Sequence, residues 1–376
     1  MDFTLNEEQQ LLDDSLSRFI EKDYDFESRR KCAESDPGFS REHWKLFAEL
    51  GWLAVPFAEE DGGIGGGAVE SVVMFENIGK GLVIEPYLAT VALAGRAIAM
   101  VGSSAHKSHY LNGVIDGSML GAFAYAEPRS RFNPASVTMR AEQTDDGYTL
   151  NGDKAFVLNG PSADFFVVTA RTDGARFDRN GISLFVVDAN APGIRRRDYQ
   201  TVDGARVSEL SFENTVVAAD ALMGRAGAAW ATLEQVLDEA TMAICSEAVG
   251  CMSVLCADTV EYCKGRTQFG QPIGKFQVLQ HRMVDMFMAH EQTRSLMYMA
   301  AIRMDEGYGR EAQHVVSALK VQTAKAGTFV GQQAVQLHGG MGMTDEMHIG
   351  HYFKRLTAIE KLFGNADHHL DRMAAL

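Results

Sequence analysis

The sequence predicts an α+β protein with a helical N-terminal domain, a middle β-barrel or sandwich domain and a C-terminal helical bundle. Three observations support this fold class. Apolar residues recur at helical spacing up to about residue 118, alternate with polar residues from about 119 to 220, and return to helical spacing over longer stretches from Trp230 onward. We therefore expect domains at residues 1–118, 119–222 and 223–376.

The N-terminal segment has the pattern of short helices joined by polar and glycine-rich loops. Thr4-Leu5-Asn6-Glu7 matches a capping box, in which a hydroxyl and a carboxylate three residues apart bind the free amides of a first turn. A polar turn at 35–38 precedes a predicted helix at 41–50. The glycine-rich loop 59–67 separates that helix from another at 69–78.

The middle segment has the period of β-strands. Apolar and polar residues alternate over 137–141, and Asn151-Gly152 is a strong signal for a hairpin turn. Residues 165–170, 182–187 and 207–212 are predicted to be further strands between turn residues. Roughly seven short strands in a hundred residues are typical of a barrel or sandwich.

The C-terminal segment contains three long stretches with apolar residues at three-and-four spacing, at 233–262, 278–305 and 312–337. Glycine and proline lie in the connections between them. Long amphipathic helices joined by short connections are typical of a helical bundle.

The charge balance excludes some classes of partner. With 35 Lys plus Arg against 50 Asp plus Glu, the formal net charge is −15, and such a surface repels the phosphates of nucleic acids and anionic lipids. The longest apolar run, 82–101, is interrupted by Glu85 and Arg96, and the N-terminus has no basic-then-apolar signal segment. We expect a cytoplasmic protein that binds no nucleic acid and inserts into no membrane.

Neither the cysteines nor the histidines form the complete pattern of a metal site. No C-x-x-C pair occurs, so we expect buried free thiols in a reducing compartment. His348 and His351 have metal-like spacing, but no nearby carboxylate completes a zincin arrangement. The five cysteines are Cys32, Cys245, Cys251, Cys256 and Cys263.

Residues 63–68, with Glu85 about twenty residues further on, superficially match a dinucleotide-binding fingerprint. The run before these glycines contains Pro56, and no alternating series of strands and helices follows. We therefore expect an inter-helix loop here.

Two other segments are more informative, Arg-Thr-Gln-Phe-Gly-Gln-Pro-Ile at 266–273 and Gln-Leu-His-Gly-Gly-Met-Gly-Met-Thr at 336–344. Arg266 has the fork geometry to clamp a phosphate, and Phe269 can stack on a planar ring. Gly339 and Gly340 permit close backbone approach. Because helix connections are often glycine-rich without binding anything, the residue types alone leave both interpretations open.

In this order on a helical bundle, the two segments resemble those of the acyl-CoA dehydrogenase family, and the resemblance extends over the whole chain. It implies a four-helix C-terminal bundle, an acyl-CoA substrate, FAD, and electron-transfer flavoprotein as the electron acceptor. In that family the two segments hold the ADP part of an FAD whose flavin lies in a neighbouring subunit, so the site requires an oligomer. The implied ADP-side residues are Arg266, Gln268, Phe269, Gln277, Gln336, Leu337, Gly339 and Gly340.

The resemblance fails where the family does its chemistry. The family removes an α-proton with a glutamate while the β-hydrogen leaves as hydride to the flavin, yet the two known positions of that glutamate align with Gly364 and Ala240. The flavin-facing Thr-Glu-Pro-Gly-Ala-Gly-Ser motif is replaced by residues 126–132, and Trp-x-Thr by Phe156-Val157-Leu158. Phe156 is then the flavin-side candidate, and two hydroxyls that would bond the flavin are missing.

Three carboxylates are possible substitutes for the base. Glu247 lies two helical turns beyond Ala240 on the same face of the helix and is the best candidate. Glu239 and Glu360 are the others. The alternative is that Glu247 is a buried structural residue bonded to a neighbouring helix.

The retained ADP-side segments and the altered base and flavin-side positions together resemble the small subunit of two-subunit acyl-CoA dehydrogenases. These enzymes act on pimeloyl-CoA or on steroid side-chain CoA esters in bacterial steroid degradation. Two further segments also resemble that group: the opening MDFTLNEEQQ and the segment Glu85-Pro86-Tyr87-Leu88-Ala89-Thr90. It implies an α2β2 heterotetramer whose large subunit carries the base and the flavin pocket. Two alternatives are a self-sufficient homo-oligomer with Glu247 as base, and a non-catalytic scaffold relative without FAD.

Overall fold

The computed structural model describes residues 4–376, which divide into two compact units. We call residues 4–31, 67–83 and 241–376 the bundle unit, and residues 32–66 and 84–240 the sheet unit. Each unit combines N-terminal helices with later parts of the chain. The domain boundaries near residues 118 and 222 therefore stay predictions, and the first three residues of the MDFTLNEEQQ segment lie outside the described part.

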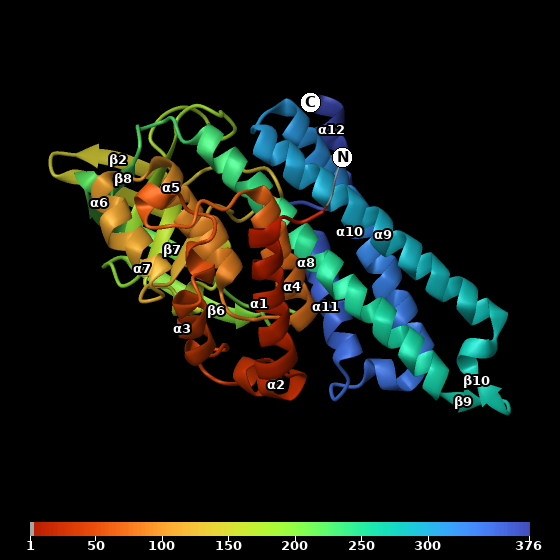
Figure 1. Cartoon of the computed structure of the whole chain (residues 1–376). Coiled ribbons are helices and arrows are strands. Elements are labelled where there is room, and N and C mark those ends of the chain that lie inside the picture. The colour runs from red at the N-terminus through yellow and green to blue at the C-terminus, as the bar shows by residue number, and fades with distance from the viewer. Residues whose placement is uncertain (1–3) are drawn as a thin grey trace. The chain divides into compact units, whose positions relative to one another are not determined.

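The sheet unit is built around an eight-stranded sheet, seen in Figure 1 among the yellow and green elements. Seven strands run in the order β6-β7-β3-β2-β4-β5-β8, and β1 pairs with β4 in parallel. The strands are β1 (Gly121–Ala124), β2 (Arg140–Thr144), β3 (Gly147–Leu158), β4 (Phe165–Arg171), β5 (Ile182–Asp188), β6 (Ile194–Gln200), β7 (Arg206–Ala218) and β8 (Leu222–Met223).

The three predicted strands at 165–170, 182–187 and 207–212 are confirmed as β4, β5 and part of β7. Apolar side chains of β1, β3, β4, β5 and β7 form the core of the sheet. β4 and β5 are buried along almost their whole length, which fits their continuous apolar sequences. β6, which contains three consecutive arginines, was not predicted and is mostly exposed.

The predicted hairpin turn at Asn151-Gly152 is wrong. Both residues lie inside β3, where the register against β7 shifts between Leu150 and Gly152, and the turn between β2 and β3 lies at 145–146. Gly152 has a φ of 144°, which a residue with a side chain rarely adopts. The turn-like pair therefore marks a bulge, for which glycine is equally suited.

Most of the helical part of the sheet unit precedes the strands, and only the start of α8 (Trp230–Gly265) follows them. Two of its segments, Leu88–Gly95 and Lys107–Leu111, are π-helical, a rare geometry that is often found near functional sites. Its other helices are α3 (Arg41–Glu49), the start of α8 up to residue 240, α5 (Arg96–Val101), α6 (Ser104–His106) and α7 (Asn112–Ile115), with short 3₁₀ turns at Trp52–Ala54 and Glu59–Asp61.

The bundle unit contains the long helices that the apolar spacing predicts. The predicted stretches 233–262, 278–305 and 312–337 are confirmed, each extended by a few residues. The helices are α1 (Glu7–Asp23), the first part of α2 (Phe26–Glu34), α4 (Ala68–Gly81), α8 (Trp230–Gly265, from 241), α9 (Gln277–Glu306), α10 (Arg310–His338), α11 (His348–Lys361) and α12 (Ala366–Ala375), with the two-residue strands β9 (Thr267–Gln268) and β10 (Gln271–Pro272).

The capping box of α1 lies two residues later than predicted. Asn6 is the N-cap, its side-chain oxygen accepts from the Gln9 amide at 2.8 Å, and the Gln9 side chain accepts from the Asn6 amide at 3.0 Å. Glu7 is therefore the first helical residue. Its negative charge interacts favourably there with the positive end of the helix dipole and stabilises the helix.

α8 is long and apolar enough to cross a membrane by length and composition alone. However, 78% of its most apolar window is buried within the protein, which is the pattern of a core helix.

α4 and α8 approach each other through two glycines. A Cβ on Gly79 would lie 1.9 Å from the backbone oxygen of Glu247, and a Cβ on Gly250 would lie 1.9 Å from that of Glu76. No side chain fits at such a distance, so only glycine at both positions allows this helix crossing.

We predict that Gly250→Ala lowers the free energy of unfolding by about 3 kcal/mol or more, because α4 and α8 must separate to admit the methyl group. Denaturant unfolding measures the change. Gly265→Ala is the matched control in the same helix, since its Cβ would meet nothing within 4 Å. If the two variants unfold alike, the close crossing does not exist in solution.

Candidate functional site

The ends of α8 and α10 lie side by side in the bundle unit, and this contact brings the two resembled segments together. The Tyr262 and His338 rings have centroids 4.3 Å apart, and the Tyr262 hydroxyl donates to the backbone oxygen of His338 at 3.3 Å. Tyr262 lies four residues before Arg266, and His338 lies directly before Gly339. The arginine segment and the Gly-Gly segment therefore share one end of the bundle.

The first segment forms a small hairpin whose tip projects into solvent. β9 and β10 pair through Gln268 and Gln271, and Phe269 at the tip has a positive φ of 52° with 91% of its surface exposed. Within residues 4–376 the Arg266 guanidinium makes no hydrogen bond or ion pair, and Gln277 is exposed at the start of α9. An unpaired arginine and an uncovered aromatic ring are the groups that a pyrophosphate and a flat ring require.

The second segment leaves its backbone open. A Cβ on Gly339 or Gly340 would meet nothing within 4 Å, and Gln336 is exposed, whereas Leu337 is buried in the bundle. Residues of both segments thus suit the ADP half of FAD: Arg266 for the phosphates, Phe269 and Gln268 beside the adenosine, and the two glycines for close backbone approach.

Gly364, which aligns with the family's base, has no carboxylate, and neighbouring rings fill the space that a side chain there would need. Gly364 has a φ of 116°, and a Cβ there would lie 2.5 Å from a carbon of the His368 ring and 2.9 Å from Nε2 of His369. His369 is almost fully buried, and burial lowers its pKa to about 3, so its imidazole stays neutral. Ala240, at the other aligned position, is completely buried.

Glu247 is held by a buried ion pair. Its side chain is 3% exposed, and its two carboxylate oxygens accept from Nε and Nη2 of Arg355 in α11 at 2.5 and 2.7 Å. Both oxygens are thus engaged by one guanidinium. This geometry matches the structural alternative for Glu247 and argues against its role as base.

The other two candidate carboxylates are also ion-paired. Glu239 accepts from Nε and Nη2 of Arg96 at 2.6 and 3.0 Å within the sheet unit. Glu360 lies 2.6 Å from the Lys361 ammonium within the bundle unit. Each of the three substitutes that the sequence offers is therefore committed to a basic side chain.

The flavin-side segments of the sheet unit have strained backbones. Arg129 and Arg131 have φ values of 67° and 51°, at positions where the resembled motif has glycine, and Phe156 has a φ of 55° with 41% of its surface exposed. Left-handed conformations at residues with side chains cost free energy. The backbone thus keeps the shape of the motif, but its side chains do not offer the hydroxyls that would bond a flavin.

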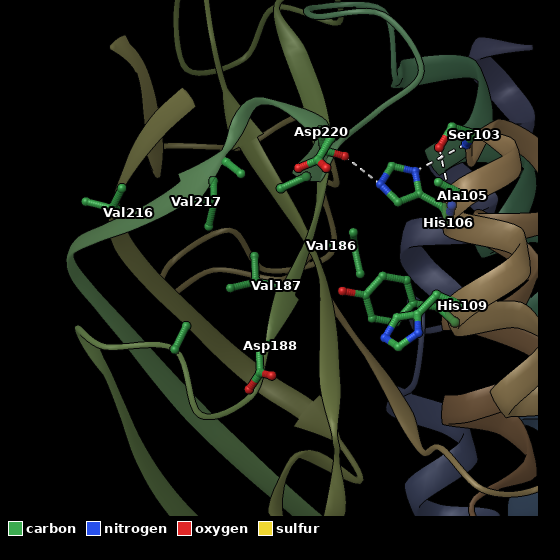
Figure 2. A pocket seen from close by; sticks show the side chains of 14 residues that line it. Ser103, Ala105, His106, His109, Val186, Val187, Asp188, Val216, Val217 and Asp220 are labelled. Atoms are coloured by element: carbon green, nitrogen blue, oxygen red, sulfur yellow. Dashed lines mark hydrogen bonds between the residues drawn. The ribbon is translucent and has the colours of Figure 1, made fainter. Parts of the chain in front are cut away.

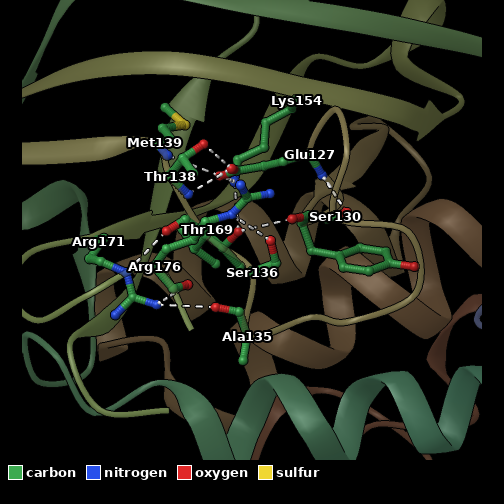
Figure 3. A network of polar contacts seen from close by, with 12 residues as sticks. Glu127, Ser130, Ala135, Ser136, Thr138, Met139, Lys154, Thr169, Arg171 and Arg176 are labelled. Atoms are coloured by element: carbon green, nitrogen blue, oxygen red, sulfur yellow. Dashed lines mark hydrogen bonds and ion pairs between the residues drawn. The ribbon is translucent and has the colours of Figure 1, made fainter. Parts of the chain in front are cut away.

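A buried ion pair anchors the start of this strained loop (Figure 3). The Glu127 carboxylate accepts from Lys154 Nζ at 2.7 Å, from the Thr138 amide at 2.6 Å and hydroxyl at 2.5 Å, and from the Met139 amide at 3.1 Å. Burial lowers the pKa of Lys154 to about 8. Burial opposes the ionisation of Glu127, but the Lys154 charge and the hydrogen bonds outweigh it and lower the pKa of Glu127.

Arg171 anchors the end of the same loop. It is almost completely buried, and its guanidinium donates to backbone oxygens of two segments, 135–137 and 173–180, at distances of 2.9 to 3.3 Å. Figure 3 shows it beside Ala135 and Arg176. Neither Lys154 nor Arg171 was predicted from the sequence, since each has a polar residue beside it and nothing local indicates that it is buried.

Family models match three consecutive parts of the chain. They describe the N-terminal domain (residues 6–118), the middle domain (122–215) and the C-terminal domain (227–375) of acyl-CoA dehydrogenases. The acyl-CoA dehydrogenase of Megasphaera elsdenii described as short-chain specific is 32% identical over 315 residues, which cover 81% of each chain. The chain belongs to the acyl-CoA dehydrogenase family.

Solved structures of this family have the same fold. Butyryl-CoA dehydrogenase from Megasphaera elsdenii matches with a TM-score of 0.91 and 28% identity, over all of this chain and 99% of the other. The ChsE4-ChsE5 complex from Mycobacterium tuberculosis matches with a TM-score of 0.89 and 28% identity, over all of this chain and 98% of that chain. The predicted α+β fold class is confirmed.

As an acyl-CoA dehydrogenase, the chain is an oxidoreductase that acts on CH–CH bonds of CoA thioesters with FAD. FAD supplies the acceptor for the hydride. The residues of this chain that fit its ADP half are those of the exposed hairpin and the Gly-Gly segment. The described carboxylates at or near the aligned base positions are all paired.

We predict that the stability of the sheet unit depends on pH through Glu127. Because the pKa of Glu127 is lower in the folded than in the unfolded protein, its contribution is present above pH ~4.5 and is lost as pH falls through the folded pKa. Glu127→Gln should therefore flatten the loss of unfolding free energy between pH 6 and 3. An unchanged slope would show that the carboxylate is not selectively stabilised.

We predict that Arg355→Met lowers the free energy of unfolding by about 3–5 kcal/mol, because it leaves the Glu247 carboxylate charged and buried without a partner. Adding Glu247→Leu should restore most of the loss. Lys264→Met, which removes the exposed Lys264–Glu261 pair, is the control and should change stability by less than about 1 kcal/mol. If Arg355→Met is as mild as this control, Glu247 does not depend on Arg355 for its place in the interior and regains its place as base candidate.

Proposed function

We propose that this acyl-CoA dehydrogenase is the small subunit of an α2β2 enzyme. It would supply the ADP-side contacts of FAD, while a larger partner subunit supplies the base and the flavin pocket. One contrast supports the proposal most strongly. Arg266 on the ADP side makes no ion pair within residues 4–376, whereas the three candidate bases, Glu239, Glu247 and Glu360, are each ion-paired.

The missing base is the first support for this division. Gly364 carries no carboxylate, and the His368 and His369 rings occupy the space that a side chain at this position would enter. A base must reach the substrate's α-carbon and accept a proton there. A proton on Glu247 would neutralise the carboxylate that pairs with Arg355 through two hydrogen bonds and leave the arginine charge without its partner.

The exposed ADP-side segment is the second support. The hairpin tip and the neighbouring face of α9 carry large apolar side chains in solvent, which is costly for an isolated chain and typical of an interface. An FAD bound there would be covered by another subunit. The exposed residues are Phe269 at the hairpin tip, Val278, Val284, Phe287 and Met288 on α9, and Met341 and Met343 in the Gly-Gly segment.

The likeness to the ChsE4-ChsE5 complex supports a partner that is a different chain, because that structure is described as a complex of two proteins. Butyryl-CoA dehydrogenase matches equally well, so the fold alone does not distinguish the arrangements. The difference must come from the residues, and the paired carboxylates favour the two-chain arrangement over a self-sufficient homo-oligomer with Glu247 as base.

The proposal extends to the substrate and the setting. We propose a bulky or dicarboxylic acyl-CoA, such as a steroid side-chain or pimeloyl thioester in lipid metabolism, electron-transfer flavoprotein as acceptor, and a cytoplasmic location. The substrate class follows from the resemblance of residues 85–90 and of the altered motifs to the two-subunit group. The acceptor follows from the family, and the location is supported by the free cysteines, which suit a reducing compartment.

We predict that the chain expressed alone binds little FAD and dehydrogenates no acyl-CoA at a measurable rate, because it lacks both the base and the flavin-side hydrogen bonds. Absorbance at flavin wavelengths and dye reduction with an acyl-CoA measure this. Co-expression with the partner encoded in the same cell should yield yellow, active protein. Stoichiometric FAD and dye reduction by the chain alone would overturn the proposal, and a partner that is fully active without this chain would make it a scaffold.

A further inference from the structure

A cavity of about 410 Å³ lies within the sheet unit, between the helical segment 103–110 and the strands β5 and β7 (Figure 2). Pockets for small organic ligands have volumes of roughly 300–1,000 Å³, so this one suits a small molecule. None of the residues that line it belongs to the hairpin, the Gly-Gly segment or the aligned base positions.

The charge of the lining is negative. Asp188 and Asp220 lie on the strand side, opposite His106 and His109 on the helical side, and no lysine or arginine is among the lining residues. One oxygen of Asp188 accepts from the Asn190 amide at 2.7 Å. The Asp220 carboxylate makes no hydrogen bond to any residue in the described part of the chain, so its charge is free to meet a ligand.

Both ring nitrogens of His106 already have partners within the sheet unit, so this side chain does not pair with the two carboxylates. Its Nδ1 accepts from the Ser103 amide at 3.2 Å, and its Nε2 donates to the backbone oxygen of Asp220 at 2.6 Å. His106 is also almost fully buried.

Aromatic and aliphatic groups complete the lining. Tyr110 and His109 come from the π-helical segment, and their ring centroids are 4.6 Å apart. Burial and then the charges of Asp188 and Asp220 raise the pKa of Tyr110, so both carboxylates act on its hydroxyl, which stays protonated. Val186 and Val187 supply an apolar wall.

We propose that this cavity is a binding site for a small organic ammonium ion with a short apolar arm. The ammonium group is attracted to the carboxylates of Asp188 and Asp220, whose charges both act on the Tyr110 hydroxyl in the same lining. The arm lies against the valines. FAD and CoA are polyanions and are repelled by the same carboxylates, so this site is separate from the dehydrogenase reaction and does not depend on the proposed subunit role.

The probe that tests this site is n-butylammonium, with butyrate as the matched anion of similar length. Saturation-transfer NMR on the full-length protein, in the assembly in which it purifies, should show saturable binding of the cation in the millimolar range and none of the anion. Equal binding of butyrate, or no saturable binding of the cation, would overturn the proposal.

Variants locate the binding. Asp188→Asn and Asp220→Asn should each weaken binding roughly threefold, as expected for partly exposed charge pairs, and Ala221→Phe should abolish it by filling the cavity while both charges remain. Asp145→Asn, in the turn between β2 and β3, is the control and should leave the affinity unchanged. If the control weakens binding as much as the two site variants, the cation binds the acidic surface in general and the site is refuted.

Discussion

The ion pair between Glu247 and Arg355 is the interaction on which the bundle unit and its chemistry depend. Two charges can remain buried only when they neutralise and hydrogen-bond each other, and these two do so through two parallel bonds. The pair joins α8 to α11, and the backbone of Glu247 also forms the contact with Gly79 that holds α4. A residue with this structural role cannot also take a proton from a substrate without weakening the packing around it.

In the sheet unit, too, buried charged residues support the backbone and are not placed to react with a substrate. Glu127, Lys154 and Arg171 keep the loop between residues 127 and 138 in the backbone shape of the family motif, while the side chains of that loop have changed. The backbone of this loop thus keeps the conformation of the family motif, whereas the hydroxyl side chains that would contact a flavin are missing. On the ADP side the candidate contact groups are present: Arg266 is exposed and makes no ion pair within residues 4–376, and Phe269 is exposed, in a protein whose net charge is −15.

Much of the fold could be predicted from the sequence because long amphipathic helices and buried strands carry strong periodic signals. The core strands β4 and β5 and the long helices α8, α9 and α10 were found in this way. The turn at Asn151-Gly152 was wrong because a glycine in a bulge and a glycine in a hairpin look alike in sequence. The partner of Glu247 could not be predicted, since Arg355 lies 108 residues away and nothing local indicates the pairing.

Purification of the protein from its native cell, with subunit masses and FAD content measured together, tests whether this chain holds only part of an acyl-CoA dehydrogenase site. We expect two kinds of chain in equal amounts, with about one FAD for each pair. An assembly that contains this chain alone, with one FAD for each copy, would contradict it.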